Sequence, residues 1–182
     1  MTILDENDNV LLPYTEGEIC IRGYNVAQEY LGLPELNKTS FRNGWFHSGD
    51  YGMKDENEYL YFHGRKDSLI IKGGENIYPA ELENILYNHP GIAECAVVGI
   101  PHKLLGEEIC AFVKLKDGKE LTENELKEFC NGKIAKFKHA KKIIIIDKQE
   151  DLSEIPKGPT KKVLYRELKK YYLSNICNVI ND

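Results

Sequence analysis

Apolar and polar residues alternate in the first third of the chain, a period of two that is typical of half-buried β-strands. The stretch GEICIRG (17–23) follows this pattern, and GMKDENEYLYFHGR (52–65) has a polar centre followed by the alternating YLYFH. The pattern predicts a strand over the first stretch and a β-hairpin over the second. Residues 1–66 are therefore expected to form a β-rich unit.

From residue 67 onwards, apolar residues recur at helical spacing. Pro79 suits the first turn of one helix, and Thr122 and Glu125 have the spacing of a capping box at the start of a second. A third amphipathic helix is predicted over 160–173. The positions that define the apolar stripes of the first two helices are Leu82, Ile85, Leu86 and His89, and then Leu126, Phe129, Cys130 and Ile134.

Apolar runs between these helices predict strands, among them CAVVGI (95–100), EEICAFVKLK (107–116) and KKIIIID (141–147). The predicted fold class is α+β: a small mixed sheet of three strands with flanking helices over 67–182, preceded by the β-rich unit.

Composition fits a folded protein, because 42% of the 182 residues are apolar. The longest aliphatic run, Ile143–Ile146, is far too short to span a membrane, and the acidic start MTILDENDNV lacks the pattern of a signal peptide. A cytoplasmic protein without an integral membrane segment is expected. Five scattered cysteines without a CxxC pair predict buried thiols rather than disulfides or a zinc site.

The net charge of −5 conceals a basic segment. Residues 133–173 carry 12 basic and 5 acidic residues, a local charge of +7. Such a segment can meet phosphate, nucleic acid or an acidic partner domain, and its sign alone does not choose among them.

Three short motifs could carry chemistry. In WFHSGDYG (45–52), Asp50 is predicted to lie in a glycine-bounded turn, where its carboxylate bonds the backbone or a ligand hydroxyl; His47 is expected to be structural. In KGGENIYPAELE (72–83), two glycines precede a helix, which favours either a plain turn or an anion-binding backbone. No GxGxxG or GxxxxGK[ST] pattern occurs.

The third motif is SEIPKGPTKKVLYREL (153–168). Pro156, Gly158 and Pro159 stiffen the approach to Lys161 and Lys162. A solvated basic surface would explain paired lysines, but a rigid approach lowers the entropy lost when an ammonium group is positioned. A lysine held in this way could stabilise negative charge that develops in a transition state.

Taken in order, GEICIRG, WFHSGDYG, GRKDSLIIKGGENIYPAELE and IPKGPTKKVLYREL resemble the C-terminal part of adenylate-forming enzymes, over about residues 17–173. The form GGENIYPAELE is most similar to medium- and long-chain fatty acid–CoA ligases. The resemblance implies that 1–66 is the last, partial subdomain of a large N-terminal domain and that 67–182 is a mobile C-terminal domain.

The resemblance also implies roles for individual residues. Asp50 and Arg65 would bind the ribose of ATP or AMP, and Asp67 would be the hinge about which the C-terminal domain rotates. The family's PxGPTGK loop places Lys162 in register with the catalytic lysine of adenylation and puts Lys161 where a glycine is usual. The loop that serves the thioester half-reaction would contain Gly73, Gly74 and Glu75.

The implied reaction joins a carboxylate and ATP to form acyl-AMP, and then CoA to form a thioester. Its implied cofactors are ATP, Mg²⁺ and CoA, with no protein-bound metal. The partner implied most directly is the N-terminal adenylate-forming domain, because only about sixteen residues precede GEICIRG. Without it the chain is expected to be inactive alone, and its exposed sheet to be capable of self-association.

Two alternatives remain open at this point. The chain could belong to an adenylation domain that loads a carrier protein, or it could be a non-catalytic docking module derived from the same family. Nucleic-acid binding is not expected, because exposed aromatic residues that could stack on bases are not interleaved with the basic ones.

Overall fold

The structure is a computed structural model that describes residues 1–177. The chain forms two compact units, Met1–Asp67 and Ser68–Asp182. The division falls one residue beyond the boundary expected from the sequence, and the last five residues of the predicted second domain lie outside the described residues. That the first unit is part of a larger domain stays a prediction.

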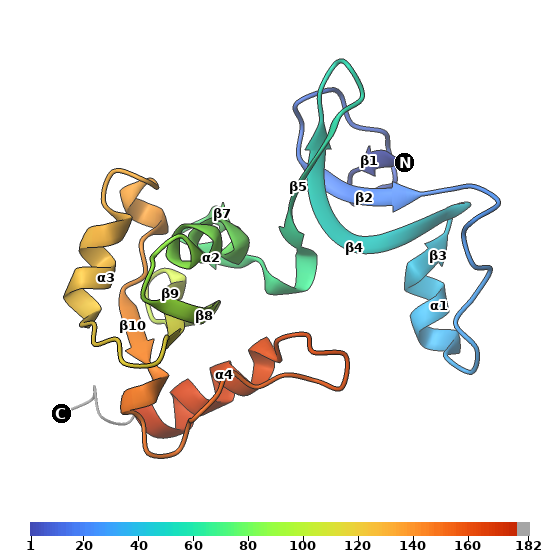
Figure 1. Cartoon of the computed structure of the whole chain (residues 1–182). Helices are drawn as coiled ribbons and strands as arrows, with labels where there is room; N and C mark the ends of the chain where they lie inside the picture. The colour runs from blue at the N-terminus through green and yellow to red at the C-terminus, as the bar shows by residue number, and fades with distance from the viewer. Residues whose placement is uncertain (178–182) are drawn as a thin grey trace. The chain divides into compact units, whose positions relative to one another are not determined.

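The first unit is an antiparallel sheet with one short helix (Figure 1). Its strands follow the order β1-β2-β4-β3, and β5 pairs with the second half of β4, whose first residues pair with β3. The predicted strand at 17–23 and hairpin at 52–65 are confirmed by β2 and by the β4–β5 pair. The elements are β1 (Thr2–Leu4), β2 (Gly17–Ile21), α1 (Pro34–Ser40), β3 (Phe41–Arg42), β4 (Trp45–Lys54) and β5 (Leu60–Arg65).

The second unit contains a sheet of five strands, not the three expected from the sequence. Its order is β10-β9-β6-β7, with β8 also paired to β9; the β10–β9 pair is parallel and the others are antiparallel. The two additional strands, β6 and β7, lie on either side of Gly73 and Gly74. Each has three residues, too few to show a period of two. The elements are β6 (Ile70–Lys72), β7 (Glu75–Ile77), β8 (Ile92–His102), β9 (Gly106–Leu115) and β10 (Lys142–Ile145).

Three α-helices accompany this sheet in the described residues: α2 (Pro79–Tyr87), α3 (Glu123–Cys130) and α4 (Tyr165–Tyr171), the last of which continues as a π-helix over Tyr172–Ile176. The capping box of α3 is confirmed, since Thr122 Oγ1 accepts the N–H of Glu125 at 3.3 Å and the Glu125 carboxylate accepts the N–H of Thr122 at 2.7 Å. The predicted start of the last helix at residue 160 is wrong. Residues 157–163 form a small hairpin, and α4 begins at Tyr165.

Both faces of this sheet are buried. One face packs with Leu82 and Leu86 of α2 and Leu126 of α3, and the opposite face with Leu168 of α4. Strands buried on both sides need apolar residues at successive positions, which explains why β8, β9 and β10 read as continuous apolar runs. Phe112 at the centre is fully buried, a burial that stabilises the fold by about 1.5–3 kcal/mol.

The cysteines are free thiols, and four of the five are buried, as predicted. Burial raises the pKa of the Cys20 thiol to about 12, so this group stays protonated. Among the described residues, no helix is long and apolar enough to cross a membrane.

Candidate functional site

The residues singled out in the sequence lie in three places: on β4 and β5, at the β6–β7 turn, and on the loop before α4. Asp50 and Arg65 belong to the first group and stand directly opposite each other in the antiparallel β4–β5 pair. Arg65 Nη1 donates to Asp50 Oδ1 at 2.8 Å and to the carbonyl oxygen of Ser48 at 3.0 Å. Strand register thus brings together two side chains that are fifteen residues apart.

The segment Ser48–Gly49–Asp50 is a bulge inside β4 and not the turn predicted from the sequence. The β2–β4 register runs from Cys20↔His47 to Glu18↔Tyr51, so β4 has two extra residues opposite β2. Gly49 has φ +71°, a left-handed conformation that glycine adopts without strain, and the strand continues on both sides. Bulges of this kind redirect side chains, here the carboxylate of Asp50.

Glu18, which the sequence did not single out, and Ser48 support this bulge. Glu18 accepts the N–H of Gly49 at 3.0 Å, and Ser48 Oγ both donates to the carbonyl oxygen of Ile19 at 2.7 Å and accepts the N–H of Asp50 at 3.0 Å. Glu18 sits in the alternating pattern of a strand, where a polar residue is ordinarily exposed. Its burial could not be anticipated without the pairing of β2 with β4.

The guanidinium of Arg65 packs closely on the bulge, because a Cβ built on Gly49 would lie 3.1 Å from Arg65 Nη2. Partial burial opposes the charge of Arg65, but the hydrogen bond and the negative charge of Asp50, with Asp67 adding to them, raise its pKa above the usual value. The Arg65 guanidinium therefore keeps its charge, and one of its edges orients the Asp50 carboxylate.

A cleft of about 510 Å³ adjoins this pair within the first unit. Hydroxyl, guanidinium and ammonium groups from Ser48, Arg65 and Lys66 line one side, and Tyr30 and Leu36 contribute apolar surface. A cleft that combines cations, hydroxyl groups and apolar surface suits a phosphorylated ligand with a planar or aliphatic part.

His47 is structural, as expected. Its buried ring lies 3.4 Å from Glu18 Oε2 and 3.6 Å from Asp8 Oδ1, and Arg42 Nε donates to its Nε2 at 3.2 Å. These contacts tie β2, β4 and the N-terminal loop together. Within the described residues, no group of three or more His, Cys, Asp or Glu side chains could hold a metal ion.

Asp67, the predicted hinge, is the last residue of the first unit and lies in the 3₁₀ turn Lys66–Ser68. Its carboxylate lies 3.5 Å from Arg65 Nε and is largely exposed. The side chain therefore carries no packing that would resist a change in the backbone at this point.

Gly73 and Gly74 form the two-residue turn of the β6–β7 hairpin, and the helix predicted after them begins at Pro79, as expected. Their φ values of +60° and +88° are those of a tight hairpin turn with both central residues left-handed. The Gly73 N–H donates to the carbonyl oxygen of Leu105 at 2.9 Å, so this amide is not free for an anion. Beneath the turn, the ammonium of Lys72 lies 2.6 Å from the buried carboxylate of Glu108.

The third group of residues, Lys161 and Lys162, lies in the lysine hairpin, residues 157–163. Lys157 and Val163 pair in antiparallel fashion. Two backbone hydrogen bonds of 2.9 Å close the loop between them: the N–H of Lys161 donates to the carbonyl oxygen of Gly158, and the N–H of Gly158 donates to the carbonyl oxygen of Lys162. The three-residue loop Pro159–Thr160–Lys161 matches a turn followed by a left-handed bulge residue. Lys161 is that residue, with φ +61°.

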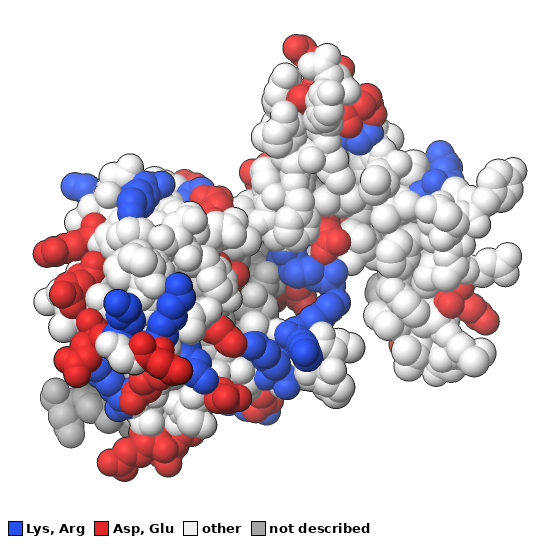
Figure 2. Space-filling model, in the orientation of Figure 1, with Lys and Arg blue, Asp and Glu red and all other residues white. Residues whose placement is uncertain are grey.

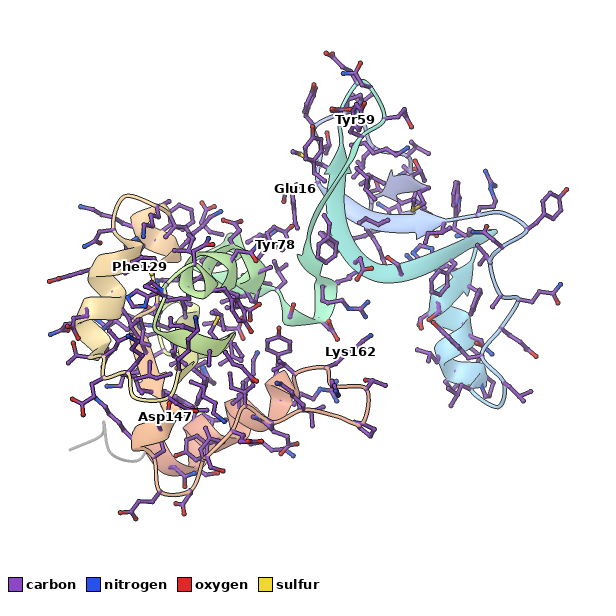
Figure 3. All side chains as sticks on the ribbon, viewed as in Figure 1. Glu16, Tyr59, Tyr78, Phe129, Asp147 and Lys162 are labelled. Carbon is purple, nitrogen blue, oxygen red and sulfur yellow. The ribbon has the colours of Figure 1, made fainter. Side chains whose placement is uncertain are left out.

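The conformation of Lys161 explains why the family usually has glycine at this position, because glycine adopts a positive φ without strain. Lys162 follows at the point where the hairpin closes and is exposed (Figure 3). No hydrogen bond or ion pair is found for either ammonium group among the described residues. Lys162 is therefore available to a ligand.

The basic segment 133–173 is partly neutralised within its own unit. Four of its lysines form ion pairs with carboxylates elsewhere in the second unit, and Figure 2 shows blue and red side chains intermingled over this part of the face in view. These pairs reduce the local charge of +7, and with it the attraction of this surface for nucleic acid. The pairs are Lys138–Glu81, Lys142–Glu123, Lys157–Glu94 and Lys169–Glu107.

Comparison with known proteins agrees with this arrangement. The sequence profile of the family described as "AMP-binding enzyme C-terminal domain" matches residues 81–171, which are 91 of the 182 residues. The chain belongs to this family. The resemblance to adenylate-forming enzymes, and with it the α+β fold class, is confirmed.

Relatives of known name are CoA ligases. The 2-succinylbenzoate–CoA ligase of Geobacillus sp. (strain WCH70) is 40% identical over 94% of this chain, and the probable CoA ligase CCL9 of Humulus lupulus is 41% identical over 97%. This chain covers 34% and 32% of those two proteins, so it spans about one third of the length of such relatives.

Solved structures of related enzymes also match nearly the whole of this chain. The o-succinylbenzoate CoA synthetase (MenE) of Bacillus subtilis, in complex with the acyl-adenylate intermediate OSB-AMP, matches 93% of this chain with a TM-score of 0.84 and 36% identity; the chain covers 33% of it. MatB of Rhodopseudomonas palustris with bound ATP matches 95% with a TM-score of 0.82 and 34% identity, and is covered to 34%. MenE has also been solved in complex with ATP and a magnesium ion.

Proposed function

We propose that this chain supplies the C-terminal third of an AMP-forming acid–CoA ligase. The observation that carries the proposal is the lysine hairpin, which presents Lys162 unpaired at the end of a closed turn in a family whose members form acyl adenylates. Asp50, oriented by Arg65, supports it with a carboxylate that can accept hydrogen bonds from two neighbouring ribose hydroxyls.

In the first half-reaction, a carboxylate oxygen attacks the α-phosphorus of ATP, and the bond to pyrophosphate breaks. Negative charge grows on the phosphoryl oxygens while two anions approach each other. An ammonium group at this point stabilises that charge, which is the role proposed for Lys162. Asp50 and Arg65 would hold the ribose, and so fix the α-phosphate relative to the lysine.

In the second half-reaction, the CoA sulfur attacks the acyl carbon and AMP leaves. We assign this half to the β6–β7 turn, with Asp67 as the hinge that exchanges the two loops. The tight turn at Gly73 and Gly74 exposes backbone without side chains, which suits the close passage of a pantetheine arm. Glu75 follows on the exposed edge of β7.

We propose a medium- or long-chain fatty acid as the carboxylate, the class implied by the resemblance of GGENIYPAELE. The named relatives make 2-succinylbenzoate the competing substrate. ATP with Mg²⁺, and CoA, would be the other reactants, and the magnesium ion would arrive with the nucleotide. The cytoplasm is the proposed location.

The partner we propose is an N-terminal adenylate-forming domain. The first unit exposes several large apolar side chains: Tyr59, Tyr61 and Phe62 at the β4–β5 hairpin, and Leu12 and Tyr14 in the N-terminal loop. The backbone N–H of Tyr14 bonds the carbonyl oxygen of Lys54, which fixes the N-terminal loop to the same hairpin. Such a surface favours docking of another domain, or self-association in its absence.

The test is complementation in trans. The chain is mixed with the N-terminal domain of a related CoA ligase, ATP, Mg²⁺, CoA and a panel of carboxylates that includes fatty acids and 2-succinylbenzoate, and acyl-CoA is followed by mass spectrometry. We expect product only with both fragments present. Product on a phosphopantetheinyl carrier but not on CoA would favour the carrier-loading alternative, and docking without any product would favour the non-catalytic module.

A further inference from the structure

We propose that Glu83 of α2, assisted by Glu94 of β8, is a positioning residue that anchors the lysine hairpin on the free edge of β8. The inference rests on the proposed function of Lys162 and identifies what sets the direction of that side chain. Glu83 lies 79 positions before Lys162 in the sequence.

The hairpin cannot fix its own orientation. It contains one antiparallel pair, Lys157 with Val163, closed by the bond from the Leu164 N–H to the carbonyl oxygen of Pro156 at 2.8 Å. Two-stranded hairpins of this size are marginally stable at best. The position of Lys162 therefore depends on what holds the two ends of the hairpin.

The downstream end is held by Glu83. Its Oε1 accepts the hydroxyl of Tyr165 at 3.3 Å and the backbone N–H of Val97 at 2.8 Å. Tyr165 is the first residue of α4 and follows Lys162 by three positions. Val97 belongs to β8, which pairs only with β9 among the described strands, so Glu83 also satisfies an edge N–H that no strand pairs.

The upstream end is held by Glu94, whose Oε2 lies 2.7 Å from the ammonium of Lys157. This pair is more than one third exposed on both sides, so solvent screens it and its contribution is smaller than that of the half-buried Glu83. Both ends of the hairpin are thus fastened to the same strand edge, one through a hydrogen-bonded carboxyl and one through an ion pair.

The first readout uses the chain alone: amide hydrogen exchange of Gly158, Lys161 and Leu164, the three backbone donors of the hairpin. Tyr165→Phe and Glu83→Ala are expected to speed their exchange about tenfold, the size of one lost organising hydrogen bond. Glu83→Gln keeps the acceptor oxygen and should behave as wild type. Glu167→Gln, which removes an exposed ion pair on the same helix, is the matched control.

The second readout separates the two half-reactions in the complementation mixture. Tyr165→Phe and Glu83→Ala should slow acyl-adenylate formation about tenfold and leave thioester formation from supplied acyl adenylate and CoA unchanged, whereas Glu83→Gln and Glu167→Gln should match wild type in both. Loss of both halves together, or faster exchange in β9 as well, would mean that Glu83 only maintains the fold and would overturn the inference. So would unchanged hairpin exchange in Tyr165→Phe. If the wild-type mixture makes no acyl adenylate, the proposed function fails while the exchange data still decide the anchoring.

Discussion

Replacing Lys161 with glycine should stabilise the protein. Lys161 has φ +61°, where the Cβ of an L-residue crowds the following carbonyl oxygen. Its exposed side chain makes no hydrogen bond or ion pair among the described residues, so little is lost with it. Most lysine-to-glycine changes destabilise a protein, which makes the expected sign diagnostic of the hairpin geometry.

The magnitude follows from two opposing terms. A side chain in the left-handed conformation costs about 1–2 kcal/mol relative to the right-handed one. Glycine also makes the unfolded chain more flexible, which lowers the free energy of unfolding by about 0.4–1 kcal/mol and offsets part of this gain. The net gain is about 0.5–1 kcal/mol, which corresponds to a rise in Tm of about 2–5 °C for a unit of this size.

The assay is urea unfolding followed by circular dichroism, with Lys162→Gly and Lys161→Ala as controls. Lys162 is not among the residues with positive φ, so Lys162→Gly should cost about 0.5–1 kcal/mol. Lys161→Ala removes the charge but keeps the strain and should be close to neutral. If Lys161→Gly destabilises the protein as much as Lys162→Gly does, the left-handed conformation of Lys161 is contradicted.

Three further changes test other parts of the structure. Thr122→Ala removes the capping box of α3 and should cost about 1 kcal/mol of unfolding free energy, measured with urea. Gly52→Ala places a Cβ on the carbonyl oxygen of Tyr61 and should cost about 1–3 kcal/mol, measured by thermal unfolding. Burial raises the pKa of Glu83 although hydrogen bonds from Val97 and Tyr165 oppose the rise, so its stabilising contribution is present at acidic pH and lost as pH rises through the raised pKa. Glu83→Gln should therefore gain stability over wild type between pH 4 and pH 7, as compared by urea unfolding at both values; an equal difference at the two pH values would contradict the raised pKa.

Elements with a long periodic signal were predicted well. The hairpin at 52–65, the capping box at Thr122 and the apolar strands β8 and β9 all follow from local sequence. The β6–β7 hairpin did not, because its strands have three residues each. The start of the last helix was placed too early because Lys161 and Lys162 favour helix by propensity, whereas backbone pairing of Gly158 with Lys162 prevents it.

Only part of the candidate site could be predicted from the sequence. Motif order brought Asp50, Arg65 and Lys162 to attention, but not their supporting residues. Glu18 and Glu83 act through strand register and through a helix–strand contact, which depend on pairings between residues distant in sequence. The turn expected at Asp50 proved to be a bulge because β2 pairs with β4 on both sides of it.

The most direct test of the account separates the two half-reactions for Lys162→Ala in complementation with an N-terminal adenylate-forming domain, with Lys161→Ala as the matched variant. The account predicts that Lys162→Ala slows acyl-adenylate formation by about 100-fold or more, leaves thioester formation from supplied acyl adenylate within about twofold, and that Lys161→Ala affects neither step strongly. Adenylate formation that survives Lys162→Ala, or that is lost with Lys161→Ala instead, would contradict it.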